Sequence, residues 1–261
     1  RGRGPRLMPF VSRDGEKFKM FIRSARSFSS ATRAYIARAG SECGAAAAPA
    51  DLVFCASCPA VLTPPLAAND ESPVAAAAAA PLYDLFGLGA PRFALDVALL
   101  TERYRGLQKR LHPDVFCGAR DEQVDAALQQ SAWVNAAYGD LMRPYSRARH
   151  LLATHGVALA SEETGPEVVD PSLLMHVMEV REDLEAARGA GDDDAVERIG
   201  EANRDALEST KMELAALFDD ALEESGEVGG CDLNAALRAT TRLRYLTTIH
   251  NEVYSLVDAD A

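Results

Sequence analysis

Apolar residues recur every three or four positions through two stretches in the middle of the chain, which indicates two amphipathic helices. The apolar face of the first comprises Leu100, Tyr104, Leu107 and Leu111. Asp96 can cap the start of this helix, and Pro113 ends it. The second helix is expected from about Asp121 to Met142, before Pro144. Its apolar face comprises Val124, Leu128, Val134, Tyr138 and Leu141.

Two shorter elements flank this pair. A short apolar cluster runs from Pro81 to Phe86 and ends at glycines 87 and 89. After Pro144, a short helix is expected near Arg147 to Thr154, closing at Gly156.

The last third of the chain predicts three more helices. Asp170 and Pro171 are a cap and a first-turn proline, and the helix that they begin should run to Gly189. A longer helix is expected over about 192–224, and Asp232 should cap a final helix that reaches Val257. No stretch alternates with a period of two for long, so no strands are predicted. The expected class is all-α, with a small helical hairpin domain followed by a three-helix bundle and preceded by a mostly disordered N-terminal segment.

Composition excludes several function classes. The chain has 261 residues, is 48% hydrophobic and carries a formal net charge of -12, which argues against nucleic acid as a partner. The sequence has no run of about 18 bulky apolar residues, so no membrane span is predicted. Five cysteines are too few and too unevenly placed for a disulfide framework. The sequence has no glycine-rich phosphate loop and no nucleophile paired with a base, so no motif indicates an enzyme.

The charge is distributed unevenly. Residues 1–40 have a net charge of +8, residues 81–159 of +1 and residues 160–232 of -17. Between Met20 and Gly40 arginines and serines alternate, acids are absent and apolar residues fall near a helical stripe. This composition is typical of an organelle transit peptide and predicts import into the mitochondrial matrix. An unstructured basic tail is the alternative.

Cysteines mark the segment that follows, residues 41–62, before a Pro/Ala-rich linker at 63–80. Cys55 and Cys58 have the two-residue gap of zinc knuckles and redox pairs. A closed structural zinc site needs four ligands, and only Cys43 lies near, because Gly40 stands where a matching pair would need a cysteine. A residual zinc-binding knuckle, a redox pair and a degenerate segment all remain open. No other cofactor is required.

A polar turn, His112-Pro113-Asp114, separates the two long helices of the hairpin. The tripeptide alone means little, and an ordinary helix-ending loop would explain it. Its setting, after a basic amphipathic helix and before an antiparallel apolar one, resembles a J-domain, the module that stimulates ATP hydrolysis by DnaK-type chaperones. The resemblance implies a chaperone-binding surface made of His112, Pro113, Asp114, Arg103, Arg105, Lys109 and Arg110.

The resemblance becomes more specific over longer motifs. Those similar to the HscB (Jac) co-chaperone family are Tyr83 to Leu88, Tyr104 to Gln108, His112 to Phe116, Ser131 to Tyr138 and Pro144 to Gly156. The similarity runs from about Leu82 to the C-terminus. It implies a J-domain at 81–159 and a scaffold-binding domain at 160–261. The implied function is to deliver an IscU-type iron–sulfur scaffold to a dedicated DnaK-type chaperone and to stimulate its ATPase.

Two alternatives to this function remain. One is a general J-protein chaperone with other clients, although no Gly/Phe-rich tract follows the J-like domain. The other is a hydrolase or metalloenzyme that would use His112, Asp114 and the cysteines.

The helix after Pro171 carries more apolar surface than a three-helix bundle needs. Leu173, Val177, Val180 and Leu184 suffice for the core face. Leu174, Met175 and Met178 fall on an adjoining face beside Glu179 and Glu182, and periodicity alone favours a broad buried stripe.

The family resemblance reverses that preference. It implies that Leu174, Met175, Met178, Glu179, Glu182 and Tyr245 contact the scaffold. One further acid of the family's patch falls on Ala186 here, and Glu185 is the candidate substitute.

Overall fold

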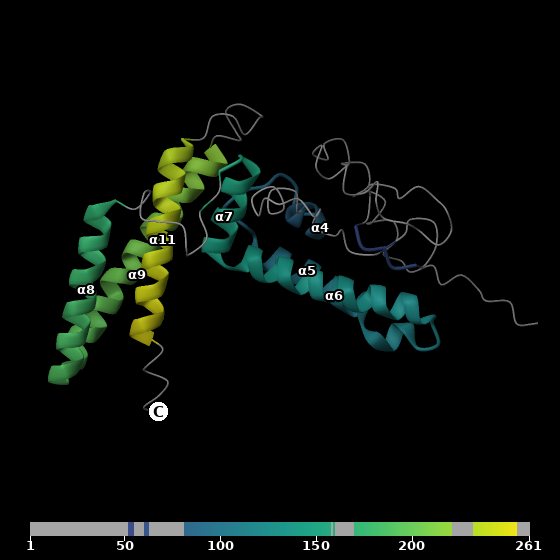
Figure 1. Ribbon diagram of the computed structural model, residues 1–261, viewed down its shortest axis with the longest axis horizontal. Coiled ribbons are helices and arrows are strands. Elements are labelled where there is room, and N and C mark those ends of the chain that lie inside the picture. The colour runs from purple at the N-terminus through teal and green to yellow at the C-terminus, as the bar shows by residue number, and fades with distance from the viewer. Residues whose placement is uncertain are drawn as a thin grey trace, which may run out of the picture.

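The computed structural model describes residues 52–54, 60–62, 81–157, 159, 170–220 and 232–254, and every regular element from residue 81 onward in these ranges is a helix. Its elements in chain order are α4 (Leu82–Phe86), α5 (Val97–Leu111), η1 (Pro113–Phe116), α6 (Asp121–Met142), α7 (Pro144–Thr154), α8 (Pro171–Ala190), α9 (Asp193–Ala215), η3 (Ala216–Asp220) and α11 (Leu233–Tyr254). Figure 1 shows an α5–α6 hairpin at one side, the α8–α9–α11 bundle at the other, and α7 between them. The all-α prediction is confirmed, whereas the predicted disordered N-terminal segment lies outside the described residues apart from 52–54 and 60–62.

Local signals set the ends of the hairpin helices. The Asp96 carboxylate accepts a hydrogen bond from the Leu99 amide at 3.0 Å, which is the predicted cap of α5. Helix α6 has the predicted bounds. Helix α7 begins at Pro144, three residues before the expected start at Arg147, because a proline at the first helical position has no amide that needs a partner.

One prediction for the core face of α6 is wrong. Leu128 is 54% exposed, whereas its neighbours Ala126 and Ala127 and the side chain of Gln130 are buried. Small alanines allow close packing on this face, and the Gln130 amide donates to backbone carbonyls of Leu52 and Leu62. A hydrophobic pattern does not identify a glutamine as a core residue, so it predicted Leu128 on the buried face of α6 instead.

Capping residues also set the ends of the bundle helices. Asp170 accepts a hydrogen bond from the Ser172 amide at 2.9 Å, and Gly191, with a φ of 68°, ends α8. Asp232 caps α11 by accepting from the amides of residues 234 and 235. The expected long helix from 192 is regular only to Ala215 and then widens into the π-helical turn η3; residues 221–231 and 255–261 lie outside the described ranges.

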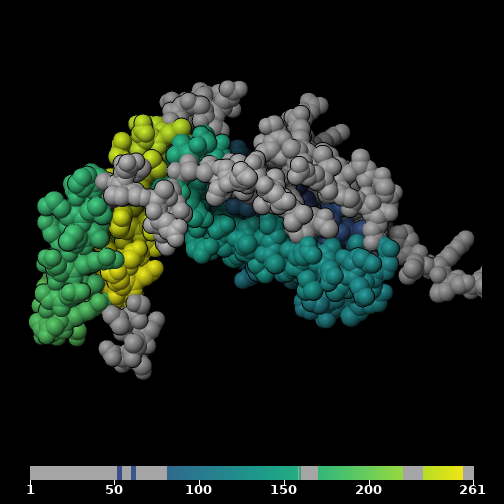
Figure 2. Space-filling model, viewed as in Figure 1, coloured from purple at the N-terminus to yellow at the C-terminus, as the bar shows by residue number. Residues whose placement is uncertain are grey.

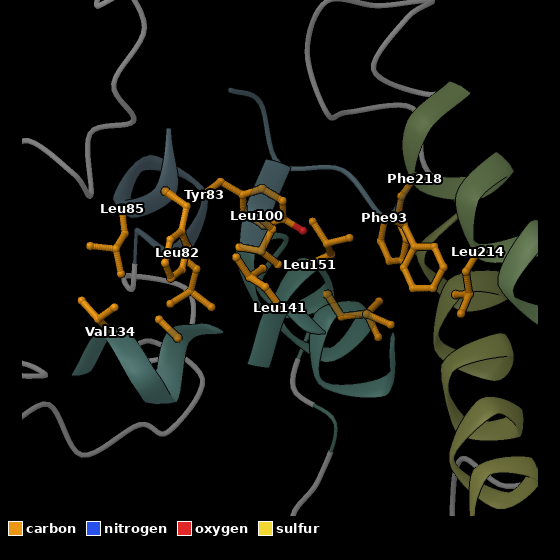
Figure 3. Close-up of a cluster of buried hydrophobic side chains, with 14 of the residues drawn as sticks. Leu82, Tyr83, Leu85, Phe93, Leu100, Val134, Leu141, Leu151, Leu214 and Phe218 are labelled. Carbon is orange, nitrogen blue, oxygen red and sulfur yellow. The ribbon is translucent and has the colours of Figure 1, made fainter. Parts of the chain in front are cut away.

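A continuous hydrophobic core joins the hairpin to the bundle. Leu100, Val134, Leu141 and Leu151 come from the hairpin and α7, and they share one cluster with Leu214 and other residues of α9 and α11. Figure 3 shows Phe93 and Phe218 at the joint between the two parts, and their stacked rings lie 6.5 Å apart. A smaller cluster holds α8 against α11.

Arg147 is the buried polar centre of this joint. Its guanidinium donates to the carbonyls of Phe93 at 2.7 Å, Leu141 at 2.8 Å and Met142 at 3.4 Å. Burial lowers the pKa of Arg147, and the nearby Asp219 opposes that shift. One side chain on α7 therefore fixes both the loop before α5 and the end of α6.

Asp219 secures the same loop from the bundle side. Its two carboxylate oxygens accept hydrogen bonds from the consecutive amides of Phe93 at 2.7 Å and Ala94 at 2.9 Å. Because Asp219 belongs to η3, the π-helical turn directs a bundle carboxylate onto a loop of the hairpin.

We expect Asp219→Ala to lower the free energy of unfolding by about 2 kcal/mol, since it leaves two backbone donors without their acceptor. Urea unfolding monitored by circular dichroism measures this change. Asp205→Ala is the matched control, because Asp205 is an exposed residue on α9. Equal stability of the two variants would contradict this role of Asp219.

We expect His155 to make the stability of the joint depend on pH. Its ring stacks on that of Phe218 with centroids 6.4 Å apart, and burial lowers the pKa of His155 below its ordinary value of 6.5. The unfolded chain therefore binds the proton more readily, and stability should fall as pH drops below about 6.5. His155→Gln should reduce this loss in thermal melts between pH 7 and 5, and an identical pH profile would refute the assignment.

Candidate functional site

The predicted His112-Pro113-Asp114 turn lies at the tip of the hairpin, where α5 ends. Asp114 is exposed, with a side-chain accessibility of 86%, and its backbone amide lies 3.3 Å from Nδ1 of His112. The Asp114 carboxylate oxygen lies 3.4 Å from the same nitrogen. Pro113 begins η1, so the chain turns sharply and directs both polar side chains toward solvent.

Helix α5 carries the predicted basic residues toward this tip. Arg105, Lys109 and Arg110 are exposed, and Arg103 is partly buried. Lys109 and Arg110 lie in the last helical turn, where a positive charge also interacts favourably with the helix dipole. The structure therefore places Lys109 and Arg110 next to the turn, whereas Arg103 and Arg105 lie nearer the middle of α5.

A polar ladder fixes the position of α5 on α6. Asn135 Oδ1 accepts hydrogen bonds from the Tyr104 hydroxyl at 3.0 Å and from Gln108 Nε2 at 2.7 Å, and Ser131 Oγ donates to Gln108 Oε1 at 3.1 Å. The rings of Tyr104 and Tyr138 stack with centroids 4.0 Å apart. These contacts join two of the sequence motifs that carry the family resemblance, and they hold the basic face in a fixed register.

The second predicted surface lies on α8. Met175 and Met178 are 63% and 61% exposed, Glu179 and Glu182 are exposed beside them, and Leu174 is partly buried. The broad buried stripe that periodicity alone favours is therefore wrong for the two methionines. Val177 and Leu184 form the core face as expected.

Contacts between α8 and α11 place Tyr245 beside this surface. Arg181 forms a two-point ion pair with Glu252, with N–O distances of 3.1 and 2.5 Å, and these residues are 71 positions apart. The first and third helices of an up-down-up bundle run in the same direction, so residues with the same separation lie side by side. Leu174 and Tyr245 are also 71 positions apart, and the Tyr245 ring packs partly buried against the smaller cluster.

The position at which this chain lacks an acid of the family's patch also lies on this surface. Ala186 and its candidate substitute Glu185 are both exposed on α8. The acidic residues on this side of the bundle therefore include Glu185 in addition to Glu179 and Glu182.

The cysteine predictions cannot be compared with the structure, because Cys43, Cys55 and Cys58 lie outside the described residues. Within the described ranges no cluster of three or more histidine, cysteine, aspartate or glutamate side chains is arranged to hold a metal ion. Cys117 is exposed and unbonded next to η1. The zinc and redox hypotheses stay predictions.

Sequence reasoning missed one residue near the basic face. The Arg110 guanidinium lies 3.6 Å from the centre of the Phe54 ring, although more than fifty residues separate them. No periodic signal surrounds Phe54, and its position next to Cys55 is the one sequence feature that marks that segment.

No helix within the described ranges is long and apolar enough to cross a membrane. Residues 169–254 match the family described as the HSCB C-terminal oligomerisation domain.

Known proteins match over a longer range. A co-chaperone protein HscB homolog of a Shewanella species (strain ANA-3) is 34% identical over 177 residues, covering 68% of this chain and 97% of the relative. The solved chaperone HscB from Vibrio cholerae superposes with a TM-score of 0.56 at 31% identity, covering 68% of this chain and 98% of that one. The crystal structure of the human co-chaperone protein HscB has a TM-score of 0.65 at 25% identity and covers 84% and 98% of the two chains. The chain therefore belongs to the HscB family, whose members are co-chaperones and not enzymes.

Proposed function

We propose that this co-chaperone binds an IscU-type iron–sulfur scaffold through its bundle and a dedicated DnaK-type chaperone through its hairpin. It thereby delivers the scaffold, stimulates the ATPase of the chaperone and promotes cluster transfer. The observation that carries the proposal is the separation of the two candidate surfaces: the tip after α5 and the exposed face of α8 lie at opposite ends of the molecule (Figures 1 and 2). Two partners can therefore bind at once without competing for space.

The hairpin tip suits an acidic chaperone surface. Exposed cations on α5 can attract such a surface over distance, and arginines can form bidentate pairs with its carboxylates. The Asp114 carboxylate, held at a fixed tip, can accept hydrogen bonds from a partner arginine or backbone amide. This chain then shifts the partner toward hydrolysis and carries out no bond chemistry itself.

The face of α8 suits a folded protein partner. Exposed methionines with carboxylates at their edge provide adaptable apolar contact and a polar rim. The basic, acid-free stretch within residues 1–40 supports a place of action in the mitochondrial matrix. A zinc ion held by Cys43, Cys55 and Cys58 is a separate part of the proposal.

Asp114→Ala should abolish stimulation of the DnaK-type ATPase while scaffold affinity stays unchanged, because the two surfaces are separate. Single-turnover ATP hydrolysis and a scaffold titration measure the two effects. Asp125→Ala is the matched control, since Asp125 is exposed on α6. Loss of both activities in the Asp114 variant would contradict the separation.

Replacing Leu174, Met178 and Tyr245 together by alanine should weaken scaffold binding by about tenfold or more, as expected for central interface residues. Calorimetric titration gives the affinity, and circular dichroism checks that the helices remain. Met212→Ala removes a methionine that is 67% exposed on α9 and controls for apolar loss elsewhere. The site would be discarded if the triple variant bound the scaffold as tightly as the unaltered chain.

A further inference from the structure

Two short N-terminal segments form a bridge that packs on the hairpin. Phe54 and Val61 pair as an antiparallel bridge, and the Leu62 amide donates to the Val53 carbonyl at 2.8 Å. We call residues 52–54 and 60–62 the N-terminal bridge. Val53 and Val61 are 1% and 3% exposed and belong to the main core cluster. The N-terminal bridge is therefore an integral part of the hairpin's core.

Two glutamines of α6 hold the N-terminal bridge in place. Gln123 Oε1 accepts from the Val61 amide at 2.8 Å. Gln130 is fully buried, and its side-chain amide donates to the carbonyl of Leu62 at 2.9 Å and to that of Leu52 at 3.3 Å. Seven residues, or two helical turns, separate the glutamines, so both lie on one face of α6. A buried polar side chain directed at these carbonyls fixes the position of the N-terminal bridge.

Phe54 extends from this anchored segment beneath the basic face. Its ring lies under the Arg110 guanidinium, with 3.6 Å between the guanidinium carbon and the ring centre. Arg110 stands in the last turn of α5, two residues before His112. A cation this close to an aromatic face is attracted to it, and a planar guanidinium also stacks on the ring. The contact thus helps to restrict the rotamers of a long side chain.

We propose that the N-terminal bridge belongs to the chaperone-binding surface and that Phe54 is a positioning residue, which holds Arg110 ready to pair with an acidic group of the chaperone. This inference rests on the proposed function. An arginine that is already ordered loses less conformational entropy when it pairs, so the partner binds more tightly. Phe54 does not need to touch the partner, because it acts through Arg110.

The test compares three variants of the full chain by the concentration that gives half-maximal ATPase stimulation of a DnaK-type chaperone. Phe54→Leu keeps an apolar side chain but removes the aromatic face, and it should raise that concentration by about two- to fivefold. Phe54→Tyr keeps the aromatic ring, so its half-maximal concentration should equal that of the unaltered chain. In an Arg110→Ala background, Phe54→Leu should have no further effect. The maximal rate and the scaffold affinity should stay unchanged in Phe54→Leu.

Two results would overturn the inference. The first is an unchanged half-maximal concentration in Phe54→Leu. The second is a Phe54→Leu effect that persists in the Arg110→Ala background, since the ring would then act through the fold of the N-terminal bridge and not through Arg110. Asp114→Ala separates this outcome from failure of the proposed function: stimulation that depends on Asp114 but not on Phe54 leaves the function standing and removes the inference.

Discussion

The loop before α5 is the point on which the arrangement of the two halves depends. Arg147 binds its Phe93 carbonyl from the hairpin side, and Asp219 binds its Phe93 and Ala94 amides from the bundle side. A buried guanidinium is costly unless its donors are satisfied, and here three carbonyls and a nearby carboxylate compensate. The rings of Phe93 and Phe218 stack at the same joint. Polar and apolar contacts therefore coincide at one joint, and they fix the angle between hairpin and bundle.

In the proposed function a fixed joint matters because it sets where one partner stands relative to the other. A flexible link would only raise the local concentration of the two partners, whereas a continuous core also defines their orientation. Charge adds to this arrangement. Residues 160–232 carry a net charge of -17, while residues 81–159 are nearly neutral overall and present their cations along α5. An acidic partner is thus attracted to the hairpin and repelled from the bundle.

Local signals in the sequence predict the helices well, and long-range contacts account for what they miss. Asp96, Asp170 and Asp232 act as caps because a capping side chain needs only its own next few residues. The buried Gln130 and the exposed Leu128 reverse the hydrophobic pattern, since the N-terminal bridge supplies the carbonyls that accept hydrogen bonds from the Gln130 side-chain amide. Asp219 in η3 likewise contacts a loop more than a hundred residues earlier, which no local pattern predicts. The proline in the sequence predicts the turn at the hairpin tip, whereas no sequence pattern predicts the contact of Phe54 with Arg110.

The face of α8 shows why periodicity alone cannot separate a core from a binding surface. Both present apolar residues at helical spacing, and the difference lies in what packs against them. Helix α11 covers Val177 and Leu184, whereas Met175 and Met178 project beyond its reach. Exposed methionines with carboxylates beside them provide an apolar contact area with a charged rim. The same carboxylates can form ion pairs with cations on a partner. The exposed methionines and their acidic rim together form the face that we propose for the scaffold.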